Sequence, residues 1–181
     1  MKLTVSKRLK EKKSELTEIR NRGDIPAVLY SANGEHENVV VAGVDFERAM
    51  RAIKQGHLPT TVFDLGSCKV IVKEIQYHPA TYQVLHVDLQ KIQPGVSFEV
   101  NIPVVCVGEA DCVGVKLGGF LRKVKRVIKV ACTPETMPVC FYLNVIDLAI
   151  GQSKRAKDIE IGQGIKLLFP LDEVIVVVAK R

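Results

Sequence analysis

The chain has 181 residues, of which 47% are hydrophobic and 25% are charged, a balance typical of a soluble globular protein rather than a disordered one. Its five cysteines are an odd number without a Cys-x-x-Cys pair, which argues against both a disulfide framework and a zinc site. No apolar run approaches the roughly 20 residues that cross a bilayer, and the N-terminus lacks the apolar core of a signal peptide, so we expect a cytoplasmic protein with no membrane contact.

The net charge of +6 is unevenly distributed along the chain. Residues 1–22 hold eight basic and three acidic side chains, a local net charge of +5, whereas residues 23–93 have a net charge of −2. A concentrated basic N-terminus on a nearly neutral body favours a surface that binds a polyanion. Charge alone fits a solvated, lysine-rich terminus equally well, so other residues must decide between the two interpretations.

The first half of the chain alternates between strand and helix patterns. In chain order, we expect a strand over 3–8, a helix over 11–22 that Gly23 ends, a hairpin over 27–42, a helix over 46–55 capped by Asp45, a second hairpin over 61–75, and a strand over 84–90. In the last strand, Leu85, Val87 and Leu89 share one face, which belongs in a core. His86 and Asp88 lie on the opposite face and therefore point outward.

The short segment Gln93-Pro94-Gly95, which is rich in residues that break strands and helices, divides the chain into two expected domains, 1–93 and 94–181. The second half predicts strands over 97–107, within 120–131, over 139–145 and over 173–179, with one helical turn within 151–158. Pro103 favours an edge position for the first of these strands, because proline cannot donate to a neighbouring strand. The fold class that we predict is mainly β, with a few short helices.

Enzyme motifs are not found in this sequence. It has no Gly-x-Ser-x-Gly, no His-Glu-x-x-His, no Walker loop and no Gly-x-Gly-x-x-Gly. His86 and Asp88 could form an acid–base pair, but no serine or cysteine nucleophile is adjacent to them in the sequence. We therefore expect no enzymatic activity, no cofactor, no metal site and no small-molecule substrate. A small enzyme that uses His86 with a cysteine is the alternative, and modification of all five thiols would test it.

The polar residues of the first half suggest contacts with nucleic acid. Arg8 and Arg20 could contact phosphates, whereas Tyr30, His86 and Asp88 could contact bases or ribose hydroxyls in a shallow RNA minor groove. A carboxylate repels phosphate, so Asp88 fits such a site only as the acceptor of a base amino group. The structural alternative is that Tyr30 packs on the rim of the sheet and Asp88 pairs with a lysine.

Several motifs resemble one bacterial family. Residues 20–30 resemble the Arg-x-x-Gly-x-Ile-Pro-Ala-Val-x-Tyr signature of the 5S-rRNA-binding ribosomal proteins, namely large-subunit ribosomal protein twenty-five and its longer form, the general stress protein Ctc. Residues 76–79 and 85–89 resemble the family's Gln-x-His-Pro and His-x-Asp-Phe elements. Residues 114–121 and 148–153 are similar to motifs in the C-terminal domain of the longer form. The resemblance thus spans nearly the whole chain.

The resemblance implies a six-stranded, barrel-like N-terminal domain that binds the loop E region of 5S rRNA, followed by a second all-β domain that extends over the subunit surface. It implies a cytoplasmic, ribosome-bound structural component whose partners are 5S rRNA and the large ribosomal subunit, and which is a monomer off the ribosome. The family's RNA contacts would fall on Arg8, Lys13, Arg20, Tyr30, Gln76, His86 and Asp88. This mechanism requires Arg20 and His86 to lie on the same side of the barrel.

The sequence departs from the family pattern before residue 20. Relatives carry a glycine-lysine-glycine turn and a run of arginines there, whereas this chain has Glu15 and Glu18. Each lost phosphate contact would weaken RNA binding and make it less sensitive to salt. The alternative function is a stress-related adaptor that binds proteins off the ribosome through the second domain, and sedimentation with ribosomal subunits would distinguish the two.

Overall fold

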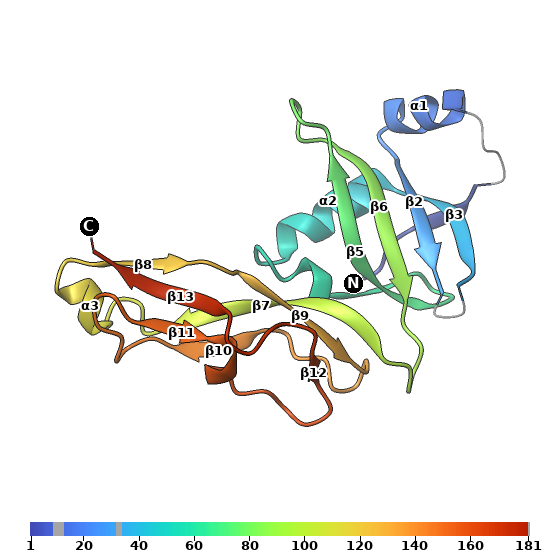
Figure 1. The fold of residues 1–181 in the computed structure, drawn as a ribbon. Helices are drawn as coiled ribbons and strands as arrows, with labels where there is room; N and C mark the ends of the chain where they lie inside the picture. Colours follow the sequence, from blue (N-terminus) through green and yellow to red (C-terminus); the bar gives the residue numbers. More distant parts are fainter. Residues whose placement is uncertain (9–12, 32–33, 181) are drawn as a thin grey trace. The chain divides into compact units, whose positions relative to one another are not determined.

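The computed structural model describes residues 1–8, 13–31 and 34–180, and it is mainly β, as the sequence predicts (Figure 1). The chain divides into two compact units, Met1–Val96 and Ser97–Arg181, so the division falls within three residues of the proline–glycine segment. Among the described residues, no helix combines the length and apolar character needed to span a membrane. Each unit is built around strands whose inward-facing residues are Val, Ile, Leu and Phe.

The described residues of unit 1 form one six-stranded sheet with two α-helices and one 3-10 turn. In chain order these are β1 (Val5–Lys7), α1 (Lys13–Asn21), β2 (Ile25–Tyr30), β3 (His36–Val41), α2 (Gly43–Ala52), η1 (Leu58–Thr60), β4 (Val62–Asp64), β5 (Lys69–Tyr77) and β6 (Val84–Lys91). The strand order across the sheet is β1-β3-β2-β6-β5-β4. β2 and β6 are parallel neighbours at its centre, and the other pairs are antiparallel.

The two edges of this sheet are joined, which makes unit 1 barrel-like. The backbone N–H of Leu3 donates to the carbonyl of Asp64 at 3.0 Å, and the N–H of Asp64 donates to the carbonyl of Met1 at 2.7 Å. Residues just before β1 thereby pair with the end of β4, at the opposite edge. The edges therefore present fewer unpaired backbone groups to other chains. The expected barrel is confirmed.

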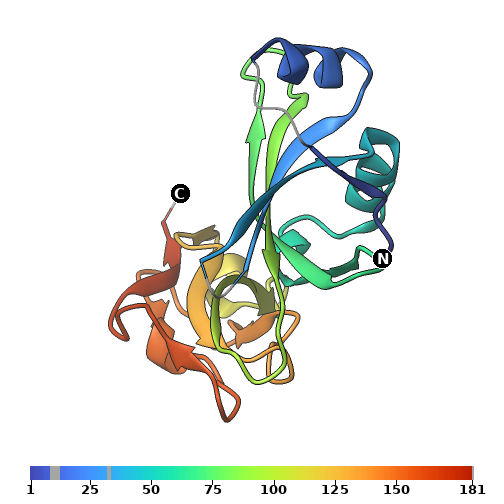
Figure 2. The ribbon, with the colours of Figure 1, turned by 90° about the vertical axis from the view of Figure 1, so that its right-hand side faces the viewer.

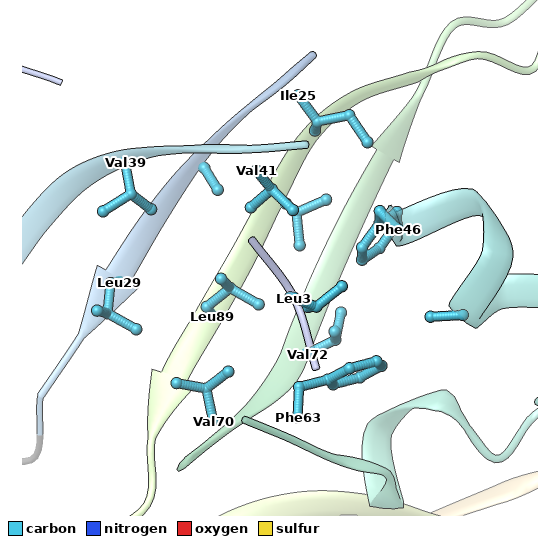
Figure 3. Packing of buried hydrophobic residues seen from close by; sticks show 13 residues of the cluster. Leu3, Ile25, Leu29, Val39, Val41, Phe46, Phe63, Val70, Val72 and Leu89 are labelled. Atoms are coloured by element: carbon cyan, nitrogen blue, oxygen red, sulfur yellow. The ribbon is translucent and has the colours of Figure 1, made fainter. Parts of the chain in front are cut away.

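The core of unit 1 lies between the curved sheet and α2. Val87 and Leu89 of β6 are fully buried, as their alternation with polar residues predicts. Phe46 from α2 and Phe63 from β4 are also fully buried, and Figure 3 shows Phe46 reaching from its helix toward the strands. Each such large side chain contributes about 1.5–3 kcal/mol by leaving water, so the core fixes which face of each strand points inward.

The start of α2 differs from the prediction. The helix begins at Gly43 rather than Phe46, and its N-cap is Ala42, which has no side chain that could cap it. Asp45 lies in the first turn, where its Oδ2 accepts a hydrogen bond of 2.6 Å from the Thr4 hydroxyl. The predicted Asp45 cap is wrong because β3 runs almost directly into the helix, and the side chain is used to hold the residues before β1.

Unit 2 contains two sheets, one short α-helix and one 3-10 turn among its described residues. Its elements are β7 (Phe98–Val107), α3 (Val113–Lys116), β8 (Phe120–Lys123), β9 (Val127–Cys132), β10 (Phe141–Asn144), β11 (Ser153–Arg155), η2 (Ala156–Asp158), β12 (Lys166–Leu167) and β13 (Val174–Ala179). The strand orders are β10-β7-β9-β12 and β11-β13-β8. The helical turn expected within 151–158 is present as η2.

The predicted edge position of Pro103 is wrong, because β7 is an inner strand. β9 pairs with residues 98–103 on one side, and β10 pairs with residues 104–107 on the other. Pro103 is the last residue of β7 that pairs with β9, and the next residue is the first that pairs with β10. Val104 supplies the next donor, to the carbonyl of Arg126 at 2.9 Å, so the missing N–H of Pro103 leaves the strand pairing intact.

The contact between Gly23 and Gly43 yields a stability prediction. Gly23 follows α1 and Gly43 begins α2, and a Cβ on Gly43 would collide with the Gly23 carbonyl oxygen. We expect Gly43→Ala to lower the free energy of unfolding by about 1–3 kcal/mol, because the backbones must separate. Urea denaturation measures this, with Val44→Ala as control, since Val44 is 71% exposed. Equal effects of the two substitutions would contradict the close contact.

Candidate nucleic-acid interface

A row of residues that are polar apart from Val28 crosses the outer face of the unit 1 sheet. Strand register places Asn38 of β3, Val28 of β2, Asp88 of β6 and Glu74 of β5 next to one another. Arg8 extends the row beyond β3, because its N–H donates to the Asn38 carbonyl at 3.0 Å. With strands about 4.8 Å apart, the backbones of Arg8 and Asp88 are separated by about 14 Å. We call these five residues the outer row.

Asp88 is held in place by side chains on both sides of it. Its Oδ1 lies 2.8 Å from Nδ1 of His86, and its Oδ2 accepts a longer hydrogen bond of 3.4 Å from the Tyr30 hydroxyl. The side chains of His86 and Asp88 are 23% and 22% exposed. Asp88 therefore pairs with His86 and Tyr30 rather than with the lysine considered above. Each carboxylate oxygen has a second lone pair, so Asp88 can still accept a bond from a ligand.

The pairing with Asp88 fixes what His86 can offer to a ligand. Nδ1 carries the proton shared with Asp88, so Nε2 is left for an outside partner. Nε2 accepts a hydrogen bond when the ring is neutral and donates one when the ring is charged. His86 can thus contact either a donor or an acceptor group on a base edge or a ribose.

Tyr30 remains a hydrogen-bond donor well into the alkaline range. Partial burial raises the pKa of its phenol, and the negative charge of Asp88, the hydrogen bond to Asp88 and the charge of Glu74 raise it further. The ring is 41% exposed at the end of β2. Tyr30 thus both orients Asp88 and presents an aromatic surface to solvent.

Amide side chains extend the polar surface along the strands. Gln76 of β5 is exposed and lies opposite His86 of β6. Gln90 lies beside Tyr30 in the parallel register, and its Oε1 accepts a hydrogen bond of 3.4 Å from Nζ of Lys73. Amides both donate and accept, so these side chains suit the mixed pattern of groups along a nucleic-acid groove.

Arg20 and His86 lie on the same side of the barrel, as the predicted mechanism requires. Nε of Arg20, in the last turn of α1, donates to the carbonyl of Leu85 at 3.1 Å, one residue before His86. Figures 1 and 2 both show α1 near the end of the β5–β6 hairpin. Because only Nε is used, the terminal nitrogens of this exposed guanidinium remain available to an anion.

Arg8 lies next to a hollow of about 380 Å³ between β1, β3 and α1. The hollow is lined by Ser6, Lys7, Arg8, Glu15, Ile19, Arg22, Asp24 and Val40. Nε of Arg8 and Oε2 of Glu15 are buried atoms with no hydrogen-bond partner among the described residues. A buried polar atom without a partner loses its hydration, so both atoms are suited to meeting an incoming ligand or water.

The two glutamates that depart from the family pattern have different environments. Glu15 is half-buried at the hollow, whereas Glu18 is exposed and lies 4.0 Å from the Arg22 guanidinium. Glu18 therefore partly neutralises Arg22, the cation that follows α1. Lys13 begins α1, but its side chain lies outside the described residues.

Sequence reasoning did not identify Asn38 and Glu74 as part of this surface. Both depend on strand register, and the pairing of β5 with β6 is shifted between Val72 and Glu74. A single sequence carries no direct signal for such a shift. The outward position of Asn38 could have been inferred, since it precedes the inward Val39 and Val41 by odd numbers of residues.

The cluster around Asp88 does not resemble a metal or thiol site. No group of three His, Cys, Asp or Glu side chains among the described residues could hold a metal ion. Cys68 packs against the barrel core. The groups gathered here are a carboxylate, an imidazole, a phenol and a guanidinium, a combination that suits hydrogen bonding to an irregular polyanion.

Comparisons with known proteins cover both units. A model of the ribosomal L25p family matches residues 3–89, and a model described as ribosomal protein TL5, C-terminal domain, matches residues 97–181. The large ribosomal subunit protein bL25 of Chlamydia muridarum (strain MoPn / Nigg) is 42% identical over 185 aligned residues, which cover 100% of each chain. The protein of the same name from Chlamydia caviae is 39% identical over the same span.

The Tyr30–Asp88 contact predicts a change in a titration. Asp88→Asn removes the negative charge beside the phenol, so we expect the raised pKa of Tyr30 to fall toward its ordinary value of 10.0, with the part due to burial remaining. Absorbance of tyrosinate follows this, and Tyr30→Phe identifies the component that belongs to Tyr30. Because the phenol of Tyr30 holds its proton more tightly in the folded protein, this group favours the fold fully below pH 10.0. That contribution is lost as the pH rises through the folded-state pKa. An unchanged titration in Asp88→Asn would rule the contact out.

Proposed function

This chain belongs to the ribosomal L25p family, and on that premise we propose that it is a structural component of the large ribosomal subunit that binds the loop E region of 5S rRNA through unit 1. The family consists of ribosomal proteins, so the expectation that the chain is not an enzyme is confirmed by its membership. A ribosomal component works in the cytoplasm, where ribosomes act. In this proposal, unit 2 adds further protein surface to the large ribosomal subunit.

The observation that carries the proposal is the position of Asp88. Its carboxylate contacts His86 and Tyr30, and Arg20 contacts the same strand at the Leu85 carbonyl. A carboxylate repels phosphate, so its presence on a phosphate-binding surface calls for a specific partner. The guanine amino group lies in the minor groove, and the wide, shallow minor groove of RNA also displays ribose hydroxyls; Asp88 can accept from either group. Arg20 on one side can then bind the backbone that borders the groove.

In the proposed complex, one set of residues supplies affinity for RNA and another set supplies selectivity. Arg8 lies beside β3 and Arg20 beside the start of β6, and phosphate contacts by such cations work on any nucleic acid. His86 and Asp88 present hydrogen-bonding groups held by their mutual contact, and Gln76 lies opposite His86. A regular duplex cannot match this fixed pattern everywhere along its groove, which favours an irregular RNA helix such as loop E.

We expect Asp88→Ala to weaken binding to 5S rRNA about tenfold or more, because one base-edge contact discriminates by about 1–3 kcal/mol. Binding to an unrelated RNA duplex should change less than about twofold, because that duplex lacks the contact. Gel-shift titration with the full chain measures both affinities. Asp111→Ala in unit 2 is the matched control, since that carboxylate pairs with Lys116 and its side chain is 71% exposed. Equal losses on the two RNAs would show that Asp88 does not contact bases.

Arg20→Ala should weaken binding to both RNAs and make binding less sensitive to salt. Loss of one phosphate contact reduces the slope of log affinity against log salt concentration by nearly one unit. The control is Arg48→Ala, an exposed cation on α2 that leaves the α1 and β6 contacts unchanged. If both substitutions change the slope alike, general charge rather than the place of Arg20 determines binding.

The off-ribosome adaptor is the other function considered for this chain. Sedimentation of the full chain with large subunits in high-magnesium buffer separates the two. A ribosomal component moves with the subunit peak and leaves it when excess free 5S rRNA is added. A chain that stays at the top of the gradient under both conditions would favour the adaptor.

A further inference from the structure

The loop that joins β5 to β6 presents an exposed aromatic ring that is not part of the outer row. Tyr82 is 78% exposed, and Tyr77, at the end of β5, is 46% exposed. Tyr77 and Tyr82 thus lie at the same end of the β5–β6 hairpin, whereas Tyr30 is level with Gln90 near the other end of β6. Exposure on this scale is unusual for a large ring, which ordinarily gains by leaving water.

The backbone at Tyr82 has a conformation that side chains other than glycine rarely adopt. Its φ is 56°, and it is the one non-glycine residue among those described whose φ is positive. Such a conformation persists only where the surrounding structure imposes it, and it often marks a functional position. A glycine here would fold more easily, so the ring is present despite the strain.

The backbone of the loop is held by several hydrogen bonds. The N–H of His78 donates to the Gln83 carbonyl at 2.8 Å, and the N–H of Tyr82 donates to the His78 carbonyl at 2.9 Å. Nδ1 of His78 accepts bonds from the N–H groups of Ala80 and Thr81, at 3.3 and 3.2 Å. Because the loop backbone is already ordered, a contact made by the Tyr82 ring requires little further ordering of the chain.

The loop adjoins the candidate RNA surface. Gln76 pairs with His86 near its base, and the Leu85 carbonyl of the same hairpin accepts the bond from Arg20. The residues on either side of Tyr82 are exposed and small or polar: Pro79, Ala80, Thr81 and Gln83. A single ring surrounded by such residues lacks the apolar patch that a protein partner or a lipid surface would need.

We propose that Tyr82 stacks on an unpaired nucleobase of the bound RNA, with Tyr77 at the base of the same loop. The inference rests on the proposed function and adds a contact outside the groove. Every base has a π face, so an exposed aromatic ring binds an unpaired base whatever its identity. Arg20, next to the hairpin, is placed to hold the phosphate of a nucleotide turned out of the helix.

The test uses the full chain with Tyr82→Asn and Tyr82→Phe. Asparagine takes a positive φ more readily than other non-glycine residues, so Tyr82→Asn removes the ring while the loop keeps its shape. In thermal unfolding, Tyr82→Phe should match the unmodified chain and Tyr82→Asn should be at least as stable, because asparagine tolerates the positive φ better. We expect Tyr82→Asn to weaken binding to 5S rRNA about tenfold and Tyr82→Phe to stay within about twofold. Tyr142→Ala, which removes a 66% exposed ring in unit 2, is the control and should have no effect.

A set of 5S rRNAs, each with one unpaired nucleotide made abasic, locates the contact. One of these RNAs should bind the unmodified chain and Tyr82→Asn equally, because the stacking partner is already missing. The inference is overturned if Tyr82→Asn loses the same factor on every abasic RNA, or if it binds intact 5S rRNA as well as the unmodified chain does. Asp88→Ala, measured alongside, separates this failure from that of the proposed function: it should still weaken 5S rRNA binding when only the stacking idea is wrong.

Discussion

The register of β6 between its two neighbours is the constraint on which unit 1 depends. β6 is parallel to β2 and antiparallel to β5, so a single strand determines what lies beside what across the middle of the barrel. Val87 and Leu89 are fully buried, whereas His86 and Asp88, which alternate with them, point outward. A slip of one residue would place His86 and Asp88 in the core and expose the apolar set. The burial that stabilises the barrel therefore also positions the polar surface.

Much of this arrangement could be predicted from local patterns, because alternation along a strand is visible in the sequence. The outward face of 84–90, the mainly β fold and the helical turn within 151–158 are of this kind. Register is not, since it depends on which strands meet, and no local pattern indicates that Asn38 lies in line with Asp88. The edge position of Pro103 is wrong for this reason, because β9 and β10 both pair with β7. The Asp45 cap is wrong because α2 begins earlier, at Gly43, and Asp45 instead accepts a hydrogen bond from Thr4, which is distant in sequence.

The polar surface carries both signs of charge within a small area. Glu74 and Asp88 lie in adjacent strands, and Glu15 shares the hollow with Arg8. A surface built only for affinity would exclude these carboxylates, since they repel a phosphate backbone. In the proposed complex, their presence beside arginines would lower non-specific attraction and leave binding more dependent on matched hydrogen bonds. The departure of α1 from the family pattern, with Glu18 beside Arg22, acts in the same direction.

The closure of the barrel by its first residues determines the order in which a nascent chain can complete the fold. Leu3 pairs with Asp64, some 61 residues later in the chain, so the two edges of the sheet cannot join until β4 has been synthesised. β6 is synthesised later still. Contacts between such distant residues are slow to form because a long loop must close first. During synthesis the cationic start of the chain is thus exposed before the strand that supplies Asp88 has been made. Selective recognition can arise only after the last strand of unit 1 is in place.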